Sequence, residues 1–401
     1  MTLEACLALA EEMSPPITLE RERISEAEAD DIVARAGLLP RITASAYAQR
    51  LNSDRSSPLG TTPPQGLYTQ EAFAGVRAKQ VLFDGFRVWN AHAATERGID
   101  AARAGLTASR ADTVFAVAQA FVRLTEAQEL TGVAEDALSR QRKFEDLTDA
   151  LFAAGRTSRV DPLRARAQRL DAERALVAAR ASEEVAGVFL RRAIGLESQV
   201  RLRAEGPLPE ASPPSEPDQQ LLDQALHRDV DIIRLDLQIA QARATMASSS
   251  ATWFPEISLQ GSYGYRGRDI GGRAPEWVGG VFLDWAVFEG GAGKALVDKA
   301  SARTRQFEAS RRALALQVEV DLRDALAAWR VAAAAAVSVA QAVEANREAV
   351  AAVLELYRAG RGTALDVLTA ELELARAQAA RIQALGDIAV ARARVARVVG
   401  T

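Results

Sequence analysis

The side chains best suited to catalysis or metal binding are few and stand apart in the sequence. His92 and His227 are the two histidines of the 401 residues, and neither has a nucleophile or ligand motif nearby. Cys6 is the single cysteine, which excludes a disulfide framework and a cysteine-based zinc site. It falls in LEACLALA, a helical pattern, where we expect a packed core thiol. These residues predict no enzyme, no metal site and no cofactor.

EGGAGKA, which begins at Glu289, is the segment most similar to a phosphate-binding loop. That loop requires the spacing G-x-x-x-x-G-K-[ST], which is not met here. We interpret Gly290 and Gly291 as a flexible joint between a strand and a helix, because glycine adopts backbone conformations closed to other residues. Gly85, in LFDGFR, is expected to play the same part in the first half of the chain.

Composition favours long helices and argues against a nucleic-acid partner. Apolar residues make up 48% of the chain, aromatic residues 5% and charged residues 25%. A high density of Ala, Leu, Arg and Glu is typical of helices that pack through small residues. The net charge is −4 and no basic block is present, so no nucleic acid is expected.

The apolar runs are too short to predict a transmembrane helix. The longest candidate, 331–343, falls short of the roughly 20 residues that a span needs. The first twenty residues lack the basic and apolar regions of a signal peptide. We therefore expect either a cytoplasmic chain or one given without its signal peptide, and any membrane-spanning part must consist of strands.

One structural plan occurs twice along the chain. GLLPRITASAYAQR matches TWFPEISLQGSYGY, VLFDGFR matches AVFEGGA, and FAAGRTSRVDPLRARAQ matches YRAGRGTALDVLTAELE. Each copy predicts a short helix, two strands and a long helical hairpin, because the apolar period changes from two to between three and four.

The two repeats are predicted to span 1–204 and 217–401, with a proline-rich linker at 205–216. In the first repeat we expect strands at about 41–51 and 72–83 and a helical hairpin at about 88–198. In the second we expect strands at about 256–266 and 277–288 and a hairpin at about 292–399. Hairpins of this length, with heptad-like apolar spacing, are typical of coiled coils.

Apolar and polar residues alternate along the predicted strands. Val281, Leu283 and Trp285 share one face of the last strand, and Asp284 lies on the other. Such alternation is typical of a transmembrane β-strand, although a half-buried strand of a small soluble sheet has the same pattern. Four strands cannot close a barrel, which needs about eight, and lipid does not tolerate an open sheet edge. A membrane location therefore requires several chains to share one barrel.

Taken together, these segments resemble the TolC-like outer-membrane efflux and secretion channels of Gram-negative bacteria. The resemblance covers nearly the whole chain and rests on the repeat, on GLLPRI, on LFDGFR and VFEGG, and on two turns of the form aromatic-x-x-Gly followed by Asp. It implies a mainly α fold with a membrane β part, in which a homotrimer forms a twelve-stranded outer-membrane barrel and a periplasmic α-barrel. Val281, Leu283 and Trp285 would face lipid, the linker would lie in an equatorial region, and a signal peptide would have been removed.

The same resemblance implies an entrance at the periplasmic end of the helices. Asp366 matches the first aspartate of the family's entrance, and Thr369 stands where the second would be. Asp161 matches the aspartate that forms a latch by hydrogen-bonding the entrance tyrosine, here Tyr357, across neighbouring coils. Both aspartates also fit the ordinary role of a carboxylate at a helix N-terminus.

Two hairpin tips are implied to meet the hairpins of a periplasmic adaptor protein. They consist of Gly155, Arg156, Thr157, Ser158, Gly360, Arg361, Gly362 and Thr363. The arginine of the family's latch falls at Gly362, beside Arg361, so the latch is only partly matched.

The implied function is a passive exit duct of a tripartite efflux pump or a type I secretion system. A periplasmic adaptor would open it, and an inner-membrane pump or ABC exporter would supply the energy. The segment LFDGFRVWN is slightly more similar to the secretion-associated members of the family. The alternative is a soluble or periplasmic coiled-coil adaptor or scaffold without a pore, which would normally need one hairpin and a compact β-domain.

Overall fold

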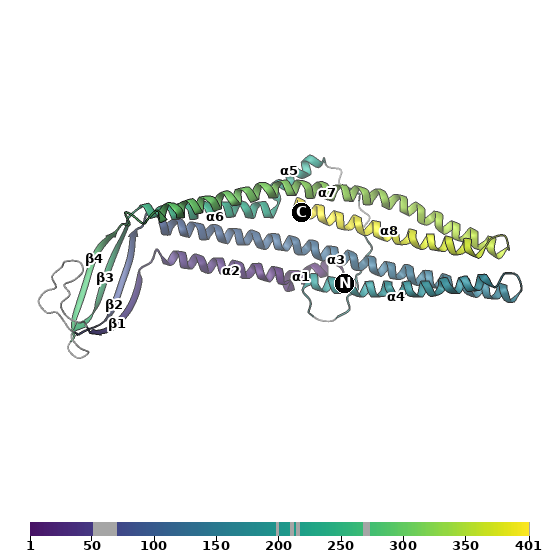
Figure 1. Ribbon diagram of the computed structural model, residues 1–401, viewed down its shortest axis with the longest axis horizontal. Coiled ribbons are helices and arrows are strands. Elements are labelled where there is room, and N and C mark those ends of the chain that lie inside the picture. The colour runs from purple at the N-terminus through teal and green to yellow at the C-terminus, as the bar shows by residue number, and fades with distance from the viewer. Residues whose placement is uncertain (51–69, 198–199, 209–211, 214–216, 268–272, 401) are drawn as a thin grey trace. The chain divides into compact units, whose positions relative to one another are not determined.

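The computed structural model describes residues 1–50, 70–197, 200–208, 212–213, 217–267 and 273–400 (Figure 1). The first repeat comprises α1 (Leu3–Met13), α2 (Pro15–Ala36), β1 (Arg41–Arg50), β2 (Gln70–Phe83), α3 (Arg87–Ala153) and α4 (Val160–Ile194). The second comprises α5 (Asp218–Arg228), α6 (Val230–Ser250), the 3-10 turn η1 (Ala251–Trp253), β3 (Glu256–Gly267), β4 (Arg273–Asp284), α7 (Ala292–Arg358) and α8 (Ala364–Val399). The prediction of a mainly helical fold with a two-fold repeat is therefore confirmed, but each repeat begins with two helices where the sequence predicted one short helix. Part of the predicted linker, 209–211 and 214–216, lies outside the described residues.

The helices end where the sequence places glycine. α3 and α7 are each 67 residues long, because neither contains a proline that would interrupt it. Each is followed by a glycine in the left-handed region, Gly155 with φ 69° and Gly360 with φ 75°. A residue with a Cβ is strained in that conformation, so glycine is the usual residue just beyond a helix end.

The four strands form one antiparallel sheet in the order β1-β2-β3-β4. The two repeats meet in its centre, where β2 pairs with β3. One row of opposed residues runs Ala44, Val76, Tyr263 and Trp277, and the next runs Thr43, Arg77, Ser262 and Val278. Because successive residues of a strand point to opposite faces, the first row belongs to an apolar face and the second to a mainly polar one.

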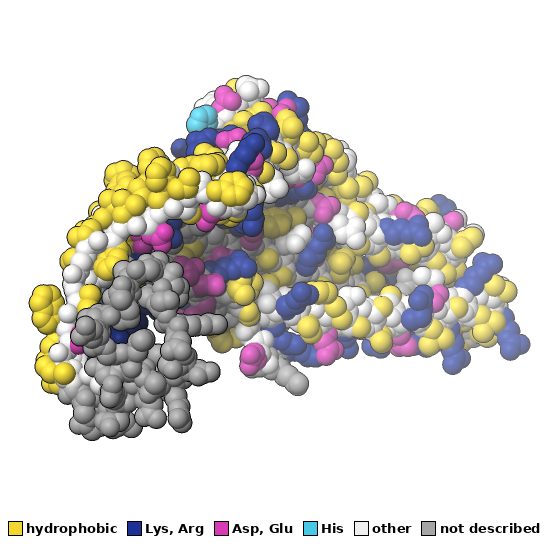
Figure 2. All heavy atoms as spheres, turned by 60° about the vertical axis from the view of Figure 1, so that its left-hand side comes forward, with side chains coloured by type: hydrophobic (Ala, Val, Ile, Leu, Met, Phe, Trp, Pro, Cys, Tyr) yellow, Lys and Arg dark blue, Asp and Glu magenta, His cyan; other side chains and the backbone are white. Residues whose placement is uncertain are grey.

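The apolar face of the sheet is exposed within the chain. Leu283 is 66% exposed and Trp277 77% exposed, and Ile42, Leu259 and Val281 on the same face are exposed as well. Figure 2 shows hydrophobic side chains gathered along the outer side of this sheet. A contiguous exposed apolar surface of this kind marks an interaction with a partner or a lipid phase.

The last strand is displaced from its predicted range and needs correction. β4 begins at Arg273 and ends at Asp284, whereas the sequence predicted a strand at about 277–288. Its partner β3 begins at Glu256, opposite Asp284, directly after Pro255, which has no backbone N–H to donate. Trp285 and the residues up to Phe288 therefore have no strand beside them to pair with.

The compact units of the chain do not coincide with its two repeats. One unit consists of residues 1–22, 104–233 and 312–401, and the other of 23–103 and 234–311. Each unit takes equivalent segments from both repeats. The repeat thus describes the order of elements along the sequence. Each compact unit instead contains a segment of one repeat together with the equivalent segment of the other.

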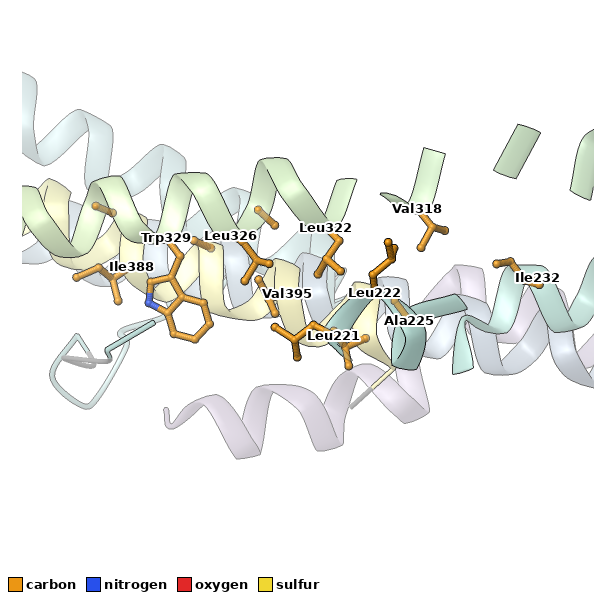
Figure 3. Packing of buried hydrophobic residues seen from close by; sticks show 14 residues of the cluster. Leu221, Leu222, Ala225, Ile232, Val318, Leu322, Leu326, Trp329, Ile388 and Val395 are labelled. Atoms are coloured by element: carbon orange, nitrogen blue, oxygen red, sulfur yellow. The ribbon is translucent and has the colours of Figure 1, made fainter. Parts of the chain in front are cut away.

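The first unit has its largest core around α5, α7 and α8. Leu221 and Leu222 of α5 pack with Trp329 of α7 and with Ile388 and Val395 of α8 (Figure 3). A second cluster joins α1 to α3 and α4, with Cys6, Val117, Leu124, Leu190 and Ile194 at its centre. Cys6 is fully buried, and burial raises the pKa of its thiol.

The second unit joins its helices through polar contacts. Asp31 of α2 is buried, and it accepts a hydrogen bond from Thr95 of α3 at 2.8 Å and contacts Nδ1 of His92 at 2.7 Å. Arg311 of α7 pairs with Asp236 of α6 at 2.5 Å. A buried carboxylate such as Asp31 is costly unless it is paired in this way, whereas the Arg311–Asp236 pair is exposed.

One helix of the described residues, α7, contains a stretch apolar enough to cross a membrane. An 18-residue window has a mean hydropathy of 1.5, and 22% of it is buried. The expectation that no helix reaches this length and apolarity is therefore too strict. Length and composition alone are weak grounds for a membrane span, and Leu326 and Trp329 of α7 lie in the core described above.

Candidate functional site at the helical turns

The turns between α3 and α4 and between α7 and α8 have the same backbone geometry. The N–H of Arg156 donates to the carbonyl of Leu151, and the N–H of Arg361 donates to the carbonyl of Leu356. Gly155 and Gly360 donate to the carbonyls of Phe152 and Tyr357. This pair of bonds is the Schellman motif, which closes a helix end with glycine in the left-handed region. The repeat therefore extends to the hydrogen bonds of the turns.

Asp366 closes the start of its own helix. Its carboxylate accepts from the backbone N–H of Thr363 at 3.0 Å, and the Thr363 hydroxyl accepts from the N–H of Asp366 at 3.2 Å. The two residues form a capping box. The hydrogen bond from the Thr363 backbone, with that from its hydroxyl, lowers the pKa of Asp366, which is exposed. Asp366 is thus an ionised carboxylate at the tip.

Thr369 supplies no second charge beside Asp366. Its hydroxyl donates to the carbonyl of Leu365 in its own helix at 2.9 Å, and the residue is exposed. The predicted entrance positions therefore combine one carboxylate with one hydroxyl.

Asp161 occupies the equivalent place in the first repeat but has different partners. It lies in the first turn of α4, whose N-cap residue makes no side-chain cap. Its Oδ2 accepts hydrogen bonds from the hydroxyl of Thr157 and from the hydroxyl of Tyr357, the latter at 3.4 Å. The structure thus brings the two predicted latch residues together, one from each helical hairpin.

Tyr357 is held in place by apolar packing around its ring. It is 6% exposed, and its ring centroid lies 5.4 Å from that of Phe144 of α3. The surrounding cluster includes Ala165 of α4 and Val367 and Leu368 of α8. Burial raises the pKa of Tyr357, and the negative charge of Asp161 acts in the same direction. The phenol therefore stays protonated and can donate.

The arginine of the family's latch has no structural counterpart. A Cβ at Gly362 would lie 3.2 Å from the backbone nitrogen of Tyr357 and 3.3 Å from Cβ of Leu356, so the turn is closely packed there. Arg361 is exposed, and no ion pair links it to any other described residue. The hydrogen bonds at the predicted latch thus join a tyrosine, an aspartate and a threonine, with no arginine.

The tips themselves face solvent in the single chain. Gly155, Arg156 and Ser158 are exposed in the first turn, as are Gly360 and Thr363 in the second. Thr157 is half-buried because its hydroxyl bonds Asp161. The tips therefore present a surface on which a second protein can dock.

Two contacts that join α3 to α8 were not predicted from the sequence. Arg140 pairs with Glu371 at 2.7 Å, and Glu371 is 9% exposed. Glu126 lies directly against Gly386, with its carboxylate where a Cβ of residue 386 would stand. Pairing of segments so distant in the chain leaves no local pattern, although a glycine within a helical segment, as at Gly386, can have a packing reason.

The strand-to-helix joints repeat a conformation as well. Gly85 has φ 68° and Phe86 φ 63°, while Gly290 has φ 63° and Gly291 φ 90°. A Cβ at Gly85 would lie 2.7 Å from Cβ of Phe254, whereas Gly290 and Gly291 meet nothing within 4 Å. Glycine adopts left-handed backbone without strain, so Gly85, Gly290 and Gly291 suit these joints, whereas Phe86 adopts it at a steric cost.

Two of the three predicted lipid-facing residues lie on the apolar face of the sheet. Val281 is opposite Leu259 and Leu283 is opposite Ile257. Trp285 follows the end of β4 and is 54% exposed. Asp284 lies on the other face, opposite Glu256.

The repeat, the sheet and the paired turns define the class of TolC-like outer-membrane channels. Within this class the chain belongs to the outer membrane efflux protein family, whose sequence profile matches residues 7–196 and 221–401. The outer membrane efflux protein BepC of Brucella suis biovar 1 (strain 1330) is 26% identical over 407 residues, which cover 97% of this chain and 83% of that protein.

Solved structures share the fold over almost the whole chain. The outer-membrane channel OprN superposes with a TM-score of 0.85 at 22% identity, covering 99% of this chain and 89% of that one. The open state of the Neisseria gonorrhoeae MtrE outer membrane channel gives a TM-score of 0.82 at 24% identity, covering 99% and 88%.

Proposed function

We propose that this chain is one subunit of a trimeric, passive exit duct in the outer membrane of a Gram-negative bacterium. Its four-stranded sheet carries this proposal. Among the described residues β1 pairs only with β2 and β4 only with β3, so both outer strands have free edges. Lipid cannot satisfy the backbone groups of such edges, and further copies of the same sheet can.

The two faces of the sheet support a barrel with lipid outside and water inside. Val281 and Leu283 belong to an exposed apolar face, and Arg77 and Asp284 belong to the opposite one. A barrel strand has this alternation because one face meets hydrocarbon and the other meets the lumen. The helices then form the periplasmic tube, with the turns of Gly155 and Gly360 at its entrance.

A periplasmic adaptor opens the entrance by engaging the exposed tips. The chain has no catalytic motif, so the energy for export comes from an inner-membrane pump or an ABC exporter coupled through that adaptor. The family description favours a tripartite efflux pump over type I secretion. Gene neighbours decide between the two, since a large secreted protein beside an ABC exporter belongs to secretion.

The oligomeric state tests the proposal directly. Full-length protein purified from outer membranes should have the mass of three chains in detergent, by light scattering corrected for bound detergent. It should precipitate when the detergent is diluted, because the apolar face then meets water. A monodisperse protein that stays soluble without detergent would instead support a coiled-coil scaffold without a pore.

A further inference from the structure

The polar face of the sheet is hollowed beside its two central strands. The hollow has a volume of about 520 Å³ and is bounded by all four strands. Three of its lining side chains are cationic and three are uncharged hydrogen-bonding groups. They are Arg41, Lys79 and Arg77, and Thr43, Gln260 and Ser262.

The cations of the hollow stand unusually close in the sheet register. Arg41 of β1 lies opposite Lys79 of β2, and Arg77 lies two residues along β2 from Lys79. Like charges directly opposite each other destabilise a sheet, so this arrangement has a cost. An anion held between the cations would remove that cost.

Lys79 has a counter-ion among the described residues, but the two arginines do not. The Lys79 ammonium pairs with Glu256 at 2.7 Å, and Glu256 also contacts Arg87 at 3.3 Å. Arg41 and Arg77 are exposed, and neither forms an ion pair with any other described residue. The Arg77 guanidinium lies 5.6 Å from the ring centroid of Phe73, which steadies it on this face.

Among the residues whose side chains are described, the other carboxylates of this face do not line the hollow. Glu276 pairs with Arg266 farther along the sheet, and Asp284 stands opposite Glu256 at the end of β4. The hollow thus has two guanidinium groups without a carboxylate partner in the described part of the chain, with hydroxyl and amide donors beside them. Guanidinium forks match carboxylate, sulfonate and phosphate oxygens.

We propose that this hollow is a binding site for one anionic group of a small solute. Arg41 and Arg77 supply the charge, and Thr43, Gln260 and Ser262 donate hydrogen bonds to its oxygens. The binding chemistry belongs to the sheet itself, whereas a role on the export path rests on the proposed function. In a trimer the barrel would carry three such sites and favour anionic cargo.

A cysteine reporter in the hollow tests this site. Ser262→Cys places a thiol opposite Arg77. The native Cys6 is fully buried, so it should not react with the reagents. The reaction rate of the introduced thiol with an anionic sulfonatoethyl methanethiosulfonate is compared with that of the cationic trimethylammonioethyl reagent. Arg41→Gln with Arg77→Gln should lower the anionic-to-cationic rate ratio about tenfold at low salt. Inorganic phosphate at constant ionic strength should slow the anionic reagent only where both arginines are present.

Two matched controls separate the local charge from general effects. Arg303→Gln removes a guanidinium that lies 5.5 Å from the Phe307 ring on α7, as Arg77 lies beside Phe73, and should leave the ratio unchanged. A Ser338→Cys reporter on the exposed surface of α7 should not respond to the double substitution. An unchanged ratio in the double variant, or equal slowing by phosphate with and without the arginines, would overturn the site.

The mass of each sample in detergent distinguishes this proposal from the proposed function. A trimer whose ratio does not depend on Arg41 and Arg77 contradicts the anion site alone. A monomer whose ratio does depend on them contradicts the duct and leaves the site standing.

Discussion

The hydroxyl of Tyr357, in the last turn of α7, donates a hydrogen bond of 3.4 Å to Asp161, in the first turn of α4. The two residues come from different helical hairpins. The repeat makes Asp161 the counterpart of Asp366 and Tyr357 the counterpart of Phe152, yet Asp366 caps its own helix and Phe152 is 44% exposed. One repeat thus supplies the hydroxyl and the other the carboxylate, and the bond joins the hairpins.

Removing this bond should open the entrance without a partner protein. A typical hydrogen bond contributes about 0.5–1.5 kcal/mol net, and three copies in a trimer contribute a few kcal/mol in total. Moving a closed entrance from 99:1 to 1:99 requires about 5.5 kcal/mol, and in the wild type an adaptor supplies all of it. Without the latch a large part of that free energy is no longer needed. We expect Asp161→Ala with Tyr357→Phe to raise single-channel conductance in a planar bilayer. The ring packing of residue 357 on Phe144 is kept by the phenylalanine.

Asp366→Asn is the control for that experiment, because Asp366 does not contact Tyr357. It should reduce cation selectivity with little effect on opening, since it removes an exposed charge from the tip. If the latch double variant conducts like the wild type, packing of the cluster around Phe144 holds the entrance instead.

A side chain at Gly386 should displace the buried Glu126, because the Glu126 carboxylate occupies the space of its Cβ. Gly386→Ala should destabilise the protein by about 1–3 kcal/mol through overpacking. Gly132→Ala is the matched control, since a Cβ at that helical glycine meets nothing within 4 Å, and it should stabilise by about 0.4–1 kcal/mol. Thermal unfolding in detergent measures both. Adding Glu126→Ala to Gly386→Ala should recover part of the loss, and no recovery would contradict this contact.

The buried Glu126 should make stability depend on pH. Burial raises its pKa, and the nearby Asp387 and Glu129 act in the same direction, while the ion pair with Arg123 opposes them. A carboxyl group with a raised pKa binds its proton more tightly in the folded protein than in the unfolded one. Its contribution to the free energy of unfolding is therefore fully present below the ordinary pKa of glutamate and is lost as the pH rises through the folded pKa. Glu126→Gln should therefore raise the melting temperature at pH 7 but not at pH 4.

Loss of the ion pair with Arg123 in Glu126→Gln does not reverse this expectation. The Arg123 side chain is 53% exposed, and an ion pair of an exposed arginine contributes little to stability. An equal change in melting temperature at both pH values would show that Glu126 does not titrate in this range.

Much of this architecture could be predicted from the sequence because it depends on local signals. The pattern aromatic-x-x-Gly predicted both turns, and the alternation of apolar and polar residues predicted the strands and their two faces. The end of β4 could not be predicted, because it depends on where the partner strand begins beside Pro255. The contact of Thr157 with Asp161 and that of Glu126 with Gly386 arise from packing and leave no periodic pattern.

The two faces of β4 should differ sharply in their tolerance of charge. Leu283→Arg places a cation on the apolar face and should cost about 2–4 kcal/mol per chain if that face meets hydrocarbon. Asp284→Asn changes the opposite face and should leave the assembled protein nearly unaffected. The measurement is the yield of assembled protein in the outer membrane, and equal damage from both changes would contradict the assignment of faces.

Disulfide cross-linking between the two edge strands tests the shared barrel most directly. Ala44→Cys on β1 is combined in turn with Gly279→Cys, Val281→Cys or Leu283→Cys on β4, all of which share the apolar face. Within one chain these positions are separated by β2 and β3, so a bond between β1 and β4 has to join two chains. If three chains close one barrel, mild oxidation of intact outer membranes should give covalent dimers and trimers for one of these pairs, and none when Asp284→Cys of the opposite face replaces the β4 partner. Monomers alone for every pair would contradict the barrel and with it the exit duct.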